Sequence, residues 1–376
     1  MSKESPRILH FYKTYYPDSF GGVEQVIFQL SKGTERFGFT SEVLALSHKP
    51  RKEPFDFSGH LVHQVKNNFE VASTGFSYSA FSKFAELAKK ADLIHLHYPW
   101  PFMDVVHFAT AHGKPTVVTY HSDIIRQRTL LKLYRPLKNR FLSSVDRIVA
   151  TSPNYLESSP VLNRFRDKVV EITYGLDKST YPTPSPEILI NWRLTLGEKF
   201  FLFVGMLRYY KGLHILLDAL QGIDYPVVIL GSGPVEAELK EHAARLKLKN
   251  VHFIGALPDV DKVALLQLCY AVVFPSHLRS EAFGLSLLEG AMFGKPMISS
   301  EIGTGTSYII VNGETGIVVE PSNPEAFRNA MKTLWDNPNI AAAMGKRAEE
   351  RYWELFTAEQ MAANYAKLYQ ELLAEQ

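Results

Sequence analysis

Short apolar runs recur along the chain, and each is followed by a longer stretch with helical spacing. Runs that are apolar on both faces are typical of buried parallel strands, and the helical stretches between them are typical of crossover connections. The runs lie at residues 8–11, 43–46, 93–96, 116–120 and 147–150 in the first half, and at 200–204, 227–230, 251–254, 271–274 and 296–299 in the second. The pattern predicts an α/β protein with two doubly wound, Rossmann-like domains.

A seam between the two domains is expected near residue 175. A chain of 376 residues exceeds what one hydrophobic core usually organises. Three prolines follow within residues 182–186, and clustered prolines neither continue a helix nor join a sheet interior. We therefore expect one domain at 1–175 and a second at 176–356, with a C-terminal helix at 357–376 that packs back on the first domain.

Composition and charge exclude several classes of protein. Hydrophobic residues make up 46% of the chain and charged residues 21%, which is the balance of a folded globular protein. A formal net charge of +2 gives no reason to expect nucleic acid as a partner. The only cysteine, Cys269, excludes an intramolecular disulfide and a cysteine-based zinc cage. The polar N-terminus and the lack of an apolar run of about 20 residues predict a cytoplasmic protein, at most peripheral to the cytoplasmic face of the inner membrane.

Candidate ligand-binding residues follow the apolar runs, because open α/β sheets bind ligands at the carboxyl ends of their strands. Gly21 and Gly22 precede a helical pattern at 23–30, where backbone N–H groups can approach a bound group, although a plain turn is the alternative. Arg208 and Lys211 follow the run 200–204. They are suited to clamp a diphosphate, and an ordinary solvated pair is the alternative.

Glu281 and Glu289 form the most specific constellation. They follow the run 271–274, and Glu289 is expected in an early turn of a helix that begins just after Glu281. A glutamate and backbone N–H groups at a helix N-terminus can hold sugar hydroxyls and phosphate oxygens together, while the second glutamate reaches a ribose. Two solvated glutamates are the alternative, which the apolar surroundings of Glu289 disfavour. His121, His95 and His97 end two other runs, where histidine can both donate and accept hydrogen bonds, although structural histidines are more common.

Two other patterns could indicate dinucleotide binding or a metal site, but neither supports that function. Gly231 and Gly233 begin a dinucleotide-binding fingerprint, but Glu236 occupies the position of its third glycine. Asp259 and Asp261 form a carboxylate pair just ahead of a helical run, where aspartate is the expected cap and first-turn residue. We therefore predict no metal site.

Together these residues resemble glycosyltransferase family four, the retaining GT-B enzymes, over essentially the full length of the chain. The match rests on Gly21-Gly22, His121, Lys211-Gly212 and the pair Glu281 and Glu289 with seven residues between them. The segments 10–18, 21–26 and 302–308 look like those of bacterial mannosyltransferases that build O-antigen and similar polysaccharides. The resemblance implies a GT-B architecture, with a cleft between two Rossmann-like domains.

By this resemblance the second domain binds the nucleotide sugar and the first binds the acceptor. The implied donor contacts are Gly21 and Gly22, Arg208 and Lys211 on the diphosphate, Glu281 on sugar hydroxyls, the backbone of Phe283, Gly284 and Leu285 on sugar and phosphate, and Glu289 on the ribose. The implied catalytic residues are His121, Arg208, Lys211 and Glu281. Retention would need no carboxylate nucleophile, metal or cofactor. The family usually has its Arg directly after the glycine, where this chain has Met206, so Arg208 is a substitute.

The resemblance favours a GDP-mannose-dependent α-mannosyltransferase that acts on a growing or lipid-linked polysaccharide. A UDP-sugar donor, a nucleotide-sugar epimerase and a non-catalytic sugar-nucleotide binder are the alternatives.

The segment 126–140 is basic and interleaved with leucines. Its basic residues are Arg126, Arg128, Lys132, Arg135, Lys138 and Arg140. The pattern predicts either an amphipathic helix that lies on anionic lipid or a solvated face whose leucines pack inward. Pro136 is expected to kink or end such a helix.

Overall fold

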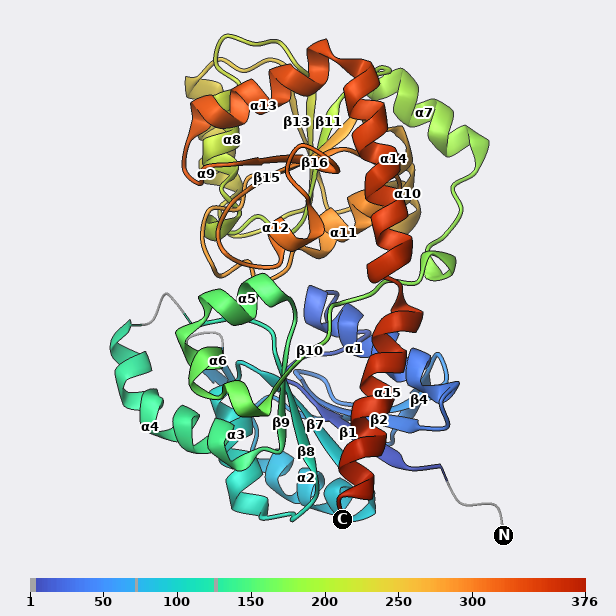
Figure 1. Ribbon diagram of the computed structural model, residues 1–376, viewed down its shortest axis with the longest axis vertical. Helices are drawn as coiled ribbons and strands as arrows, with labels where there is room; N and C mark the ends of the chain where they lie inside the picture. Colours follow the sequence, from blue (N-terminus) through green and yellow to red (C-terminus); the bar gives the residue numbers. More distant parts are fainter. Residues whose placement is uncertain (1–4, 72–73, 125–127) are drawn as a thin grey trace. The chain divides into compact units, whose positions relative to one another are not determined.

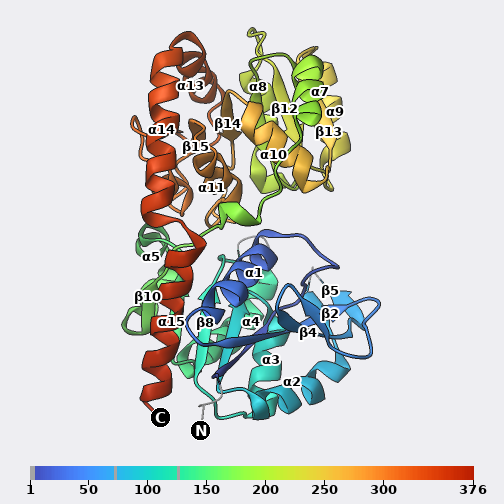
Figure 2. The same ribbon diagram turned by 90° about the vertical axis from the view of Figure 1, so that its right-hand side faces the viewer.

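The computed structural model describes residues 5–71, 74–124 and 128–376. The chain forms two compact units, one made of residues up to Gly175 together with Thr357–Gln376, and the other of Leu176–Phe356. Each unit has its own sheet with helices around it (Figures 1 and 2). No helix in the described ranges is both long and apolar enough to span a bilayer.

The first unit contains an eight-stranded sheet with the order β10-β9-β8-β7-β1-β2-β4-β3. Its strands are β1 (Arg7–Phe11), β2 (Thr40–Ser47), β3 (Phe55–Phe57), β4 (His60–Lys66), β7 (Leu93–Tyr98), β8 (Thr116–Tyr120), β9 (Arg147–Ala150) and β10 (Val169–Glu171). Neighbouring strands are parallel except for the edge pair β3 and β4, so most connections must cross over through a helix. A separate hairpin joins β5 (Phe69–Val71) to β6 (Thr74–Phe76).

The helices of the first unit include one from the far end of the chain. They are α1 (Gly22–Glu35), α2 (Tyr78–Lys90), α3 (Pro101–Thr110), α4 (Arg128–Ser144), α5 (Pro153–Ser158), α6 (Pro160–Arg164) and α15 (Ala358–Ala374). A capping box of Thr357 and Gln360 begins α15, and the helix packs along α1. Its buried residues include Met361, Leu368 and Leu372.

The second unit contains a six-stranded parallel sheet with the order β13-β12-β11-β14-β15-β16. Its strands are β11 (Phe201–Val204), β12 (Val227–Leu230), β13 (Val251–Gly255), β14 (Ala271–Phe274), β15 (Met297–Ser300) and β16 (Gly316–Val319). Its helices are α7 (Pro186–Leu196), α8 (Leu213–Ala219), α9 (Glu236–Arg245), α10 (Asp259–Leu268), α11 (Leu285–Met292), α12 (Thr306–Ile309), α13 (Pro324–Asp336) and α14 (Pro338–Leu355). This is the order of a doubly wound dinucleotide-type domain, as predicted.

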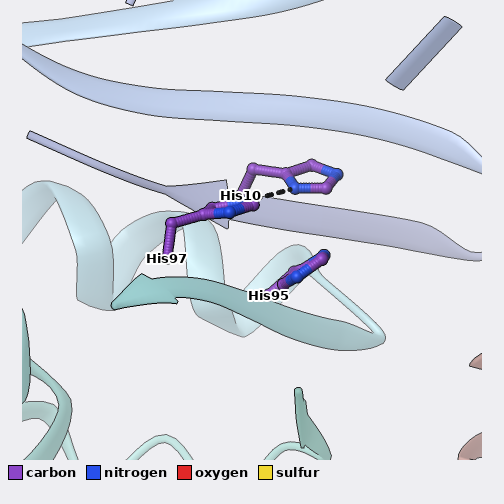
Figure 3. Close-up of side chains that lie close together, drawn as sticks. All are labelled: His10, His95 and His97. Carbon is purple, nitrogen blue, oxygen red and sulfur yellow. Dashed lines mark hydrogen bonds between the residues drawn. The ribbon is translucent and has the colours of Figure 1, made fainter. Parts of the chain in front are cut away.

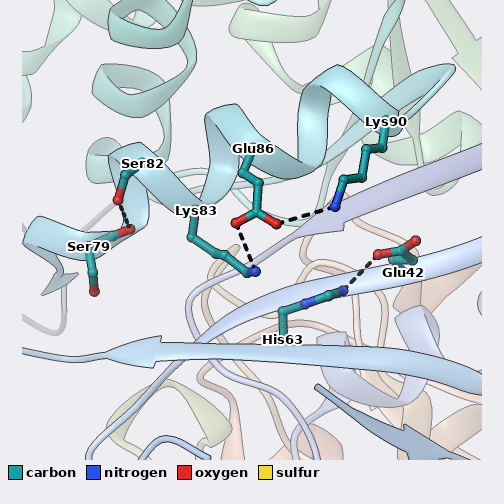
Figure 4. A network of polar contacts seen from close by, with 7 residues as sticks. All are labelled: Glu42, His63, Ser79, Ser82, Lys83, Glu86 and Lys90. Atoms are coloured by element: carbon teal, nitrogen blue, oxygen red, sulfur yellow. Dashed lines mark hydrogen bonds and ion pairs between the residues drawn. The ribbon is translucent and has the colours of Figure 1, made fainter. Parts of the chain in front are cut away.

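All ten strands predicted from apolar runs are confirmed, within three residues at either end. The pattern missed β4, whose seven residues alternate between buried and more exposed positions and include two histidines. One of these histidines, His63, forms a hydrogen bond with a residue on the neighbouring strand. The Nε2 atom of His63 on β4 donates to the Glu42 carboxylate on β2 at 2.7 Å, and this hydrogen bond lowers the pKa of the Glu42 carboxyl (Figure 4).

Strand order fixes where ligands can bind in each unit. The order reverses at β1 in the first unit and at β11 in the second, and a ligand crevice forms at the carboxyl ends of the strands beside such a reversal. The residues Gly21, Gly22 and His121 follow β1 and β8 of the first unit. Arg208, Lys211 and Glu281 follow β11 and β14 of the second.

Candidate functional site

A glycine brings the two central loops of the second unit into contact. Gly212 has a φ of 67°, and a Cβ atom there would lie 2.0 Å from the carbonyl oxygen of Pro275. The backbone N–H of His277 also donates to the carbonyl of Tyr210, at 3.2 Å. Only glycine tolerates both this conformation and this approach. The loop after β11 is therefore held against the loop after β14.

This contact pairs Lys211 with Glu281. The Nζ atom of Lys211 forms an ion pair with Oε2 of Glu281, and each side chain is only 11% exposed. The ammonium group also lies 4.7 Å from the centre of the Phe274 ring. The structure thus joins two residues that the sequence predicted separately, and it buries their charges together at the carboxyl ends of β11 and β14.

Helix α11 begins next to this ion pair. Its N-cap is Gly284, whose φ of 95° is a left-handed conformation that a side chain would strain. The first turn of a helix leaves its N–H groups without intrahelical acceptors, so Gly284, Leu285 and Ser286 offer donors beside the ion pair. The hydroxyl of Ser286 donates to the carbonyl of Val204 at 2.7 Å, which ties this turn to β11. The arrangement has the features of an anion site at a helix N-terminus.

Glu289 lies in the second turn of α11, as predicted, and is buried. Its Oε1 atom accepts hydrogen bonds from Lys262 Nζ and from the Tyr181 hydroxyl, each at 3.0 Å. Lys262 also pairs with Asp259 at 3.0 Å. Burial alone would lower the pKa of Lys262, but the two carboxylates outweigh it and raise that pKa. The local sequence pattern did not indicate Lys262 and Tyr181 as partners of Glu289.

The aspartates near Lys262 differ from the sequence prediction. The N-cap of α10 is Pro258, so Asp259 does not cap the helix and instead lies in its first turn beside Lys262. Asp261 accepts a hydrogen bond from the Trp192 indole at 2.8 Å. Each carboxylate is therefore engaged by a side chain that the local sequence pattern did not indicate.

Arg208 is less enclosed than the other predicted donor-binding residues. Its side chain is exposed, and its Nε atom contacts the sulfur of Met206 at 3.0 Å. Phe283, by contrast, is buried directly ahead of the α11 N-cap. Arg208 can therefore move without disturbing the core.

Gly21 and Gly22 begin helix α1 of the first unit, in agreement with the predicted strand-to-helix turn. The carboxylate of Glu24 organises this turn by accepting from the hydroxyls of Thr14, at 2.9 Å, and Ser19, at 2.7 Å. A Cβ atom on Gly21 would lie 2.4 Å from this carboxylate. Glu24 was not among the predicted site residues, although its place three residues after the Gly21 cap is a known signal for contacts at a helix start.

His121 follows β8 and is buried, with 5% of its surface exposed. Its Nε2 atom lies 2.9 Å from Nδ1 of His97, and its Nδ1 atom is hydrogen-bonded to the Tyr174 hydroxyl. Burial lowers the pKa of His121 to about 3, so the imidazole is neutral near pH 7. Both ring nitrogens therefore have partners within the first unit.

Models of two glycosyltransferase families match consecutive parts of the chain. The model "Glycosyltransferase Family 4" matches residues 20–178, and "Glycosyl transferases group 1" matches residues 186–351. The chain is 64% identical to the D-rhamnosyltransferase WbpZ of Pseudomonas aeruginosa over 94% of this chain and 92% of that protein. It is 50% identical to the O-antigen chain mannosyltransferase C of Escherichia coli, over 98% and 99% respectively.

Solved structures of similar fold cover almost the whole chain. A sucrose-phosphate synthase from Thermosynechococcus elongatus aligns with a TM-score of 0.80 at 22% identity, over 99% of this chain and all of the other. The Anabaena protein Alr3699/HepE in complex with UDP and glucose aligns with a TM-score of 0.77 at 20% identity, over 97% of this chain and all of the other. At these identities the likeness concerns the fold.

Proposed function

The chain belongs to glycosyltransferase family 4 and has the GT-B fold, and we propose that it extends an O-antigen polysaccharide with a sugar of the D-mannose type taken from a GDP-linked donor. The acceptor in this proposal is a growing or lipid-linked glycan. The observation that carries it is the buried Lys211–Glu281 pair beside the N-terminus of α11.

The names of two relatives support the proposed donor sugar. One is named as a D-rhamnosyltransferase and the other as a mannosyltransferase. D-rhamnose is 6-deoxy-D-mannose, so the two sugars share their ring configuration and differ by one hydroxyl group at C6. We therefore propose GDP-mannose, which the sequence favoured, or its 6-deoxy analogue as the donor.

The proposed chemistry uses the charges next to α11. The bond between sugar C1 and the leaving phosphate oxygen breaks, the acceptor oxygen bonds to C1 on the same face, and the acceptor's proton passes to the leaving phosphate. Negative charge grows on the diphosphate during this step. Lys211, Arg208 and the N–H groups of Gly284 and Leu285 would stabilise that charge, which is a large effect in many enzymes. Lys211 has three N–H donors and can bind phosphate while it stays paired with Glu281.

The two glutamates would hold the hydroxyls of the donor. Glu281 is proposed to bind those of the sugar, because it stands next to the site assigned to the diphosphate. Glu289 is proposed to bind the ribose, since only its Oε1 atom is engaged by Lys262 and Tyr181 among the described residues. Its Oε2 atom can accept from two vicinal hydroxyls.

The first unit is proposed to supply Gly21, Gly22 and His121. His121 is neutral, so in this proposal it does not act as a general acid near pH 7. Both of its ring nitrogens have partners in the first unit, so it would hydrogen-bond the donor sugar only where a sugar hydroxyl takes the place of the Tyr174 hydroxyl at Nδ1. The Glu24 carboxylate fills the space beside Gly21, so the contact proposed at the start of α1 is one to backbone N–H groups.

The first experiment is calorimetric binding of GDP and UDP to the purified protein in chelator. We expect GDP to bind at least tenfold more tightly than UDP, without added metal. A preference for UDP would move the donor to a glucose-type sugar and contradict the proposal. Transfer assays with GDP-mannose and GDP-D-rhamnose then identify the sugar. A glycoside product supports transfer, whereas an epimerised donor or no product would favour an epimerase or a non-catalytic binder.

A further inference from the structure

Four buried histidines form a polar layer in the interior of the first unit. His10 lies on β1, His95 and His97 lie on β7, and His121 directly follows β8. All four are at most 5% exposed. His10 pairs with His95 in the strand register, and side chains two apart on a strand share a face, so the four rings lie on one side of the sheet. Figure 3 shows three of them, with the bond between His10 and His97.

Three of the rings form a continuous row of hydrogen bonds. Nδ1 of His10 lies 3.1 Å from Nε2 of His97, and Nδ1 of His97 lies 2.9 Å from Nε2 of His121. The row ends where Nδ1 of His121 meets the hydroxyl of Tyr174. The rings of His97 and His121 are also stacked, with centroids 5.2 Å apart and planes 20° apart. This row leads from the interior of the sheet to the residue that the proposed function assigns to the donor sugar.

The fourth histidine stands outside the row. His95 binds the Tyr369 hydroxyl with Nδ1 and the Thr119 hydroxyl with Nε2, each at 2.7 Å. Its ring lies nearly parallel to that of His97, with centroids 4.4 Å apart. The nitrogens of His10, His95 and His97 lie within 4.8 Å of one another, which is close enough for metal ligands. The nitrogens of His95 bind hydroxyls and those of His97 bind the other imidazoles of the row, so this cluster is better described as a hydrogen-bond array.

In a row of hydrogen-bonded neutral imidazoles, the nitrogen that carries the proton in one ring determines which nitrogen carries it in the next. A neutral ring has one N–H donor and one acceptor nitrogen, so the direction of one bond in the row sets the direction of the next. Burial keeps the pKa of His10 and of His121 at about 3, and that of His97 well below its usual value, so all three rings are neutral near pH 7. Only two arrangements of the whole row are then allowed.

The end of the row selects between these arrangements. The Nε2 atom of His10 is buried without a hydrogen-bond partner among the described residues. A buried donor without an acceptor is tolerated less often than an acceptor without a donor. The proton of His10 therefore belongs on Nδ1, from which it is donated to His97. His97 in turn donates from Nδ1 to His121, so His121 accepts at Nε2 and carries its own proton on Nδ1.

We infer that His10 and His97 are positioning residues that fix the tautomer and the ring orientation of His121. The inference rests on the proposed role of His121 in sugar transfer, but the tautomer itself is defined without any substrate. Neither His10 nor His97 would touch the donor, because both are fully buried.

The test is the tautomer of His121, measured by long-range nitrogen–proton NMR on enzyme with isotopically labelled histidine. In the unaltered enzyme we expect a single form with the proton on Nδ1. A proton on Nε2, or a mixture of both forms, would overturn the inference. This measurement needs no variant and no substrate, so its outcome is separate from that of the transfer assays.

The variant His97→Phe keeps a ring at that position and removes both of its hydrogen bonds. We expect a mixture of His121 tautomers and a fall in kcat of about tenfold or more, because small errors of position are costly in an active site. The Kd for GDP should stay within twofold, because the nucleotide contacts are proposed in the other unit. An unchanged tautomer or an unchanged kcat would overturn the inference.

The matched control is His95→Phe. His95 is equally buried and stacks on the same ring, but it is not part of the row. We expect it to leave the tautomer of His121 unchanged and kcat within threefold. If His97→Phe does not fold, His10→Phe breaks the same row at its far end and takes its place. A kcat loss as large in His95→Phe as in the row variants would show a general structural effect and overturn the inference.

Discussion

Lys211 and Glu281 each combine a structural contact with a proposed chemical role. Each side chain is 11% exposed, so the pair is largely removed from water. When one partner of such a pair is removed, the other charge stays buried without compensation, which destabilises the fold. Lost activity in a single variant therefore has two physical causes, and stability must be measured beside turnover.

The pair gives a prediction that separates these causes. Lys211→Met should reduce kcat about 100- to 1,000-fold, and it should lower the free energy of unfolding by about 3 kcal/mol because Glu281 is left unpaired. The double variant Lys211→Met with Glu281→Gln removes both charges, so it should regain most of that stability and none of the turnover. Denaturant unfolding and transfer assays on the same preparations give both quantities. Recovery of turnover in the double variant would contradict the role of Lys211.

The strands that the sequence predicted best are short apolar runs with different degrees of burial. The bounds of β9 agree with the predicted run although Arg147 is only partly buried, and β13 differs by one residue although all of its residues are only partly buried. The bounds of β8 and β14 agree with the predicted runs, and every residue in them is buried. β16 was missed although three of its four residues are Ile317, Val318 and Val319, so the run is apolar.

The sequence predicted which loops form the candidate site, but it did not predict the hydrogen-bond partners of Glu289. The carboxyl ends of β11 and β14 meet because the strands are adjacent, so the convergence of Lys211 and Glu281 followed from the fold. The partners of Glu289 lie 27 residues away, at Lys262, and 108 residues away, at Tyr181. Contacts over such separations depend on tertiary packing, which the local spacing of residues does not predict.

Helix α4 contains most of the basic segment 126–140, for which the sequence predicted either contact with anionic lipid or a solvated face. Pro136 was expected to kink or end this helix; the helix continues through Pro136, so the expected end is wrong. Arg126 lies outside the described residues, as do the side chains of Arg128, Leu130 and Leu131. Beyond them Leu133 is 78% exposed and has the exposed neighbours Lys132 and Arg135, whereas Lys138 is buried. An exposed leucine among cations favours a lipid surface over a purely solvated face.

This element yields a prediction with a matched control. Leu133→Asp should reduce binding to vesicles that contain anionic lipid about fivefold or more, because it removes an apolar contact and adds repulsion. Leu194→Asp on α7 alters a leucine of similar exposure, 81%, in the other unit and should change binding less than twofold. Co-sedimentation with anionic and with neutral vesicles measures both effects. Equal binding by the two variants would argue against α4 as the contact.

At the scale of the whole molecule, the two units differ in how their interiors respond to acid. Burial lowers the pKa of seven histidines in the described part of the first unit, namely His10, His60, His95, His97, His107, His112 and His121. The main buried cluster of the second unit is apolar, with residues such as Phe201, Ile229 and Met331. Burial also lowers the pKa of His214 and His277 in the second unit, but His214 is exposed and His277 only partly buried. Most of any dependence of stability on pH near neutrality should therefore originate in the first unit.

The sign of that dependence follows from proton linkage. The unfolded chain binds protons on these histidines below about pH 6.5, whereas the folded protein does not until about pH 3 for His10 and His121. The contribution of these histidines to stability is therefore fully present at a pH above their pKa in the unfolded chain, and it is lost as the pH falls below that pKa. Between pH 7.5 and 5.5 each such group lowers the free energy of unfolding by about 1.4 kcal/mol. Four fully buried rings would together remove about 5 kcal/mol, which is a large share of the total for a typical domain.

The prediction is that urea unfolding followed in the first unit becomes markedly easier between pH 7.5 and 5.5. His95→Phe should weaken this dependence by about 1.4 kcal/mol over the same interval, because it removes one titrating ring, whatever its effect on stability at pH 7.5. The exposed His48 provides the control, since His48→Gln should leave the dependence unchanged. A stability that does not vary between these two pH values would mean that the buried rings are protonated in the folded protein, and the neutral hydrogen-bond row would then be wrong.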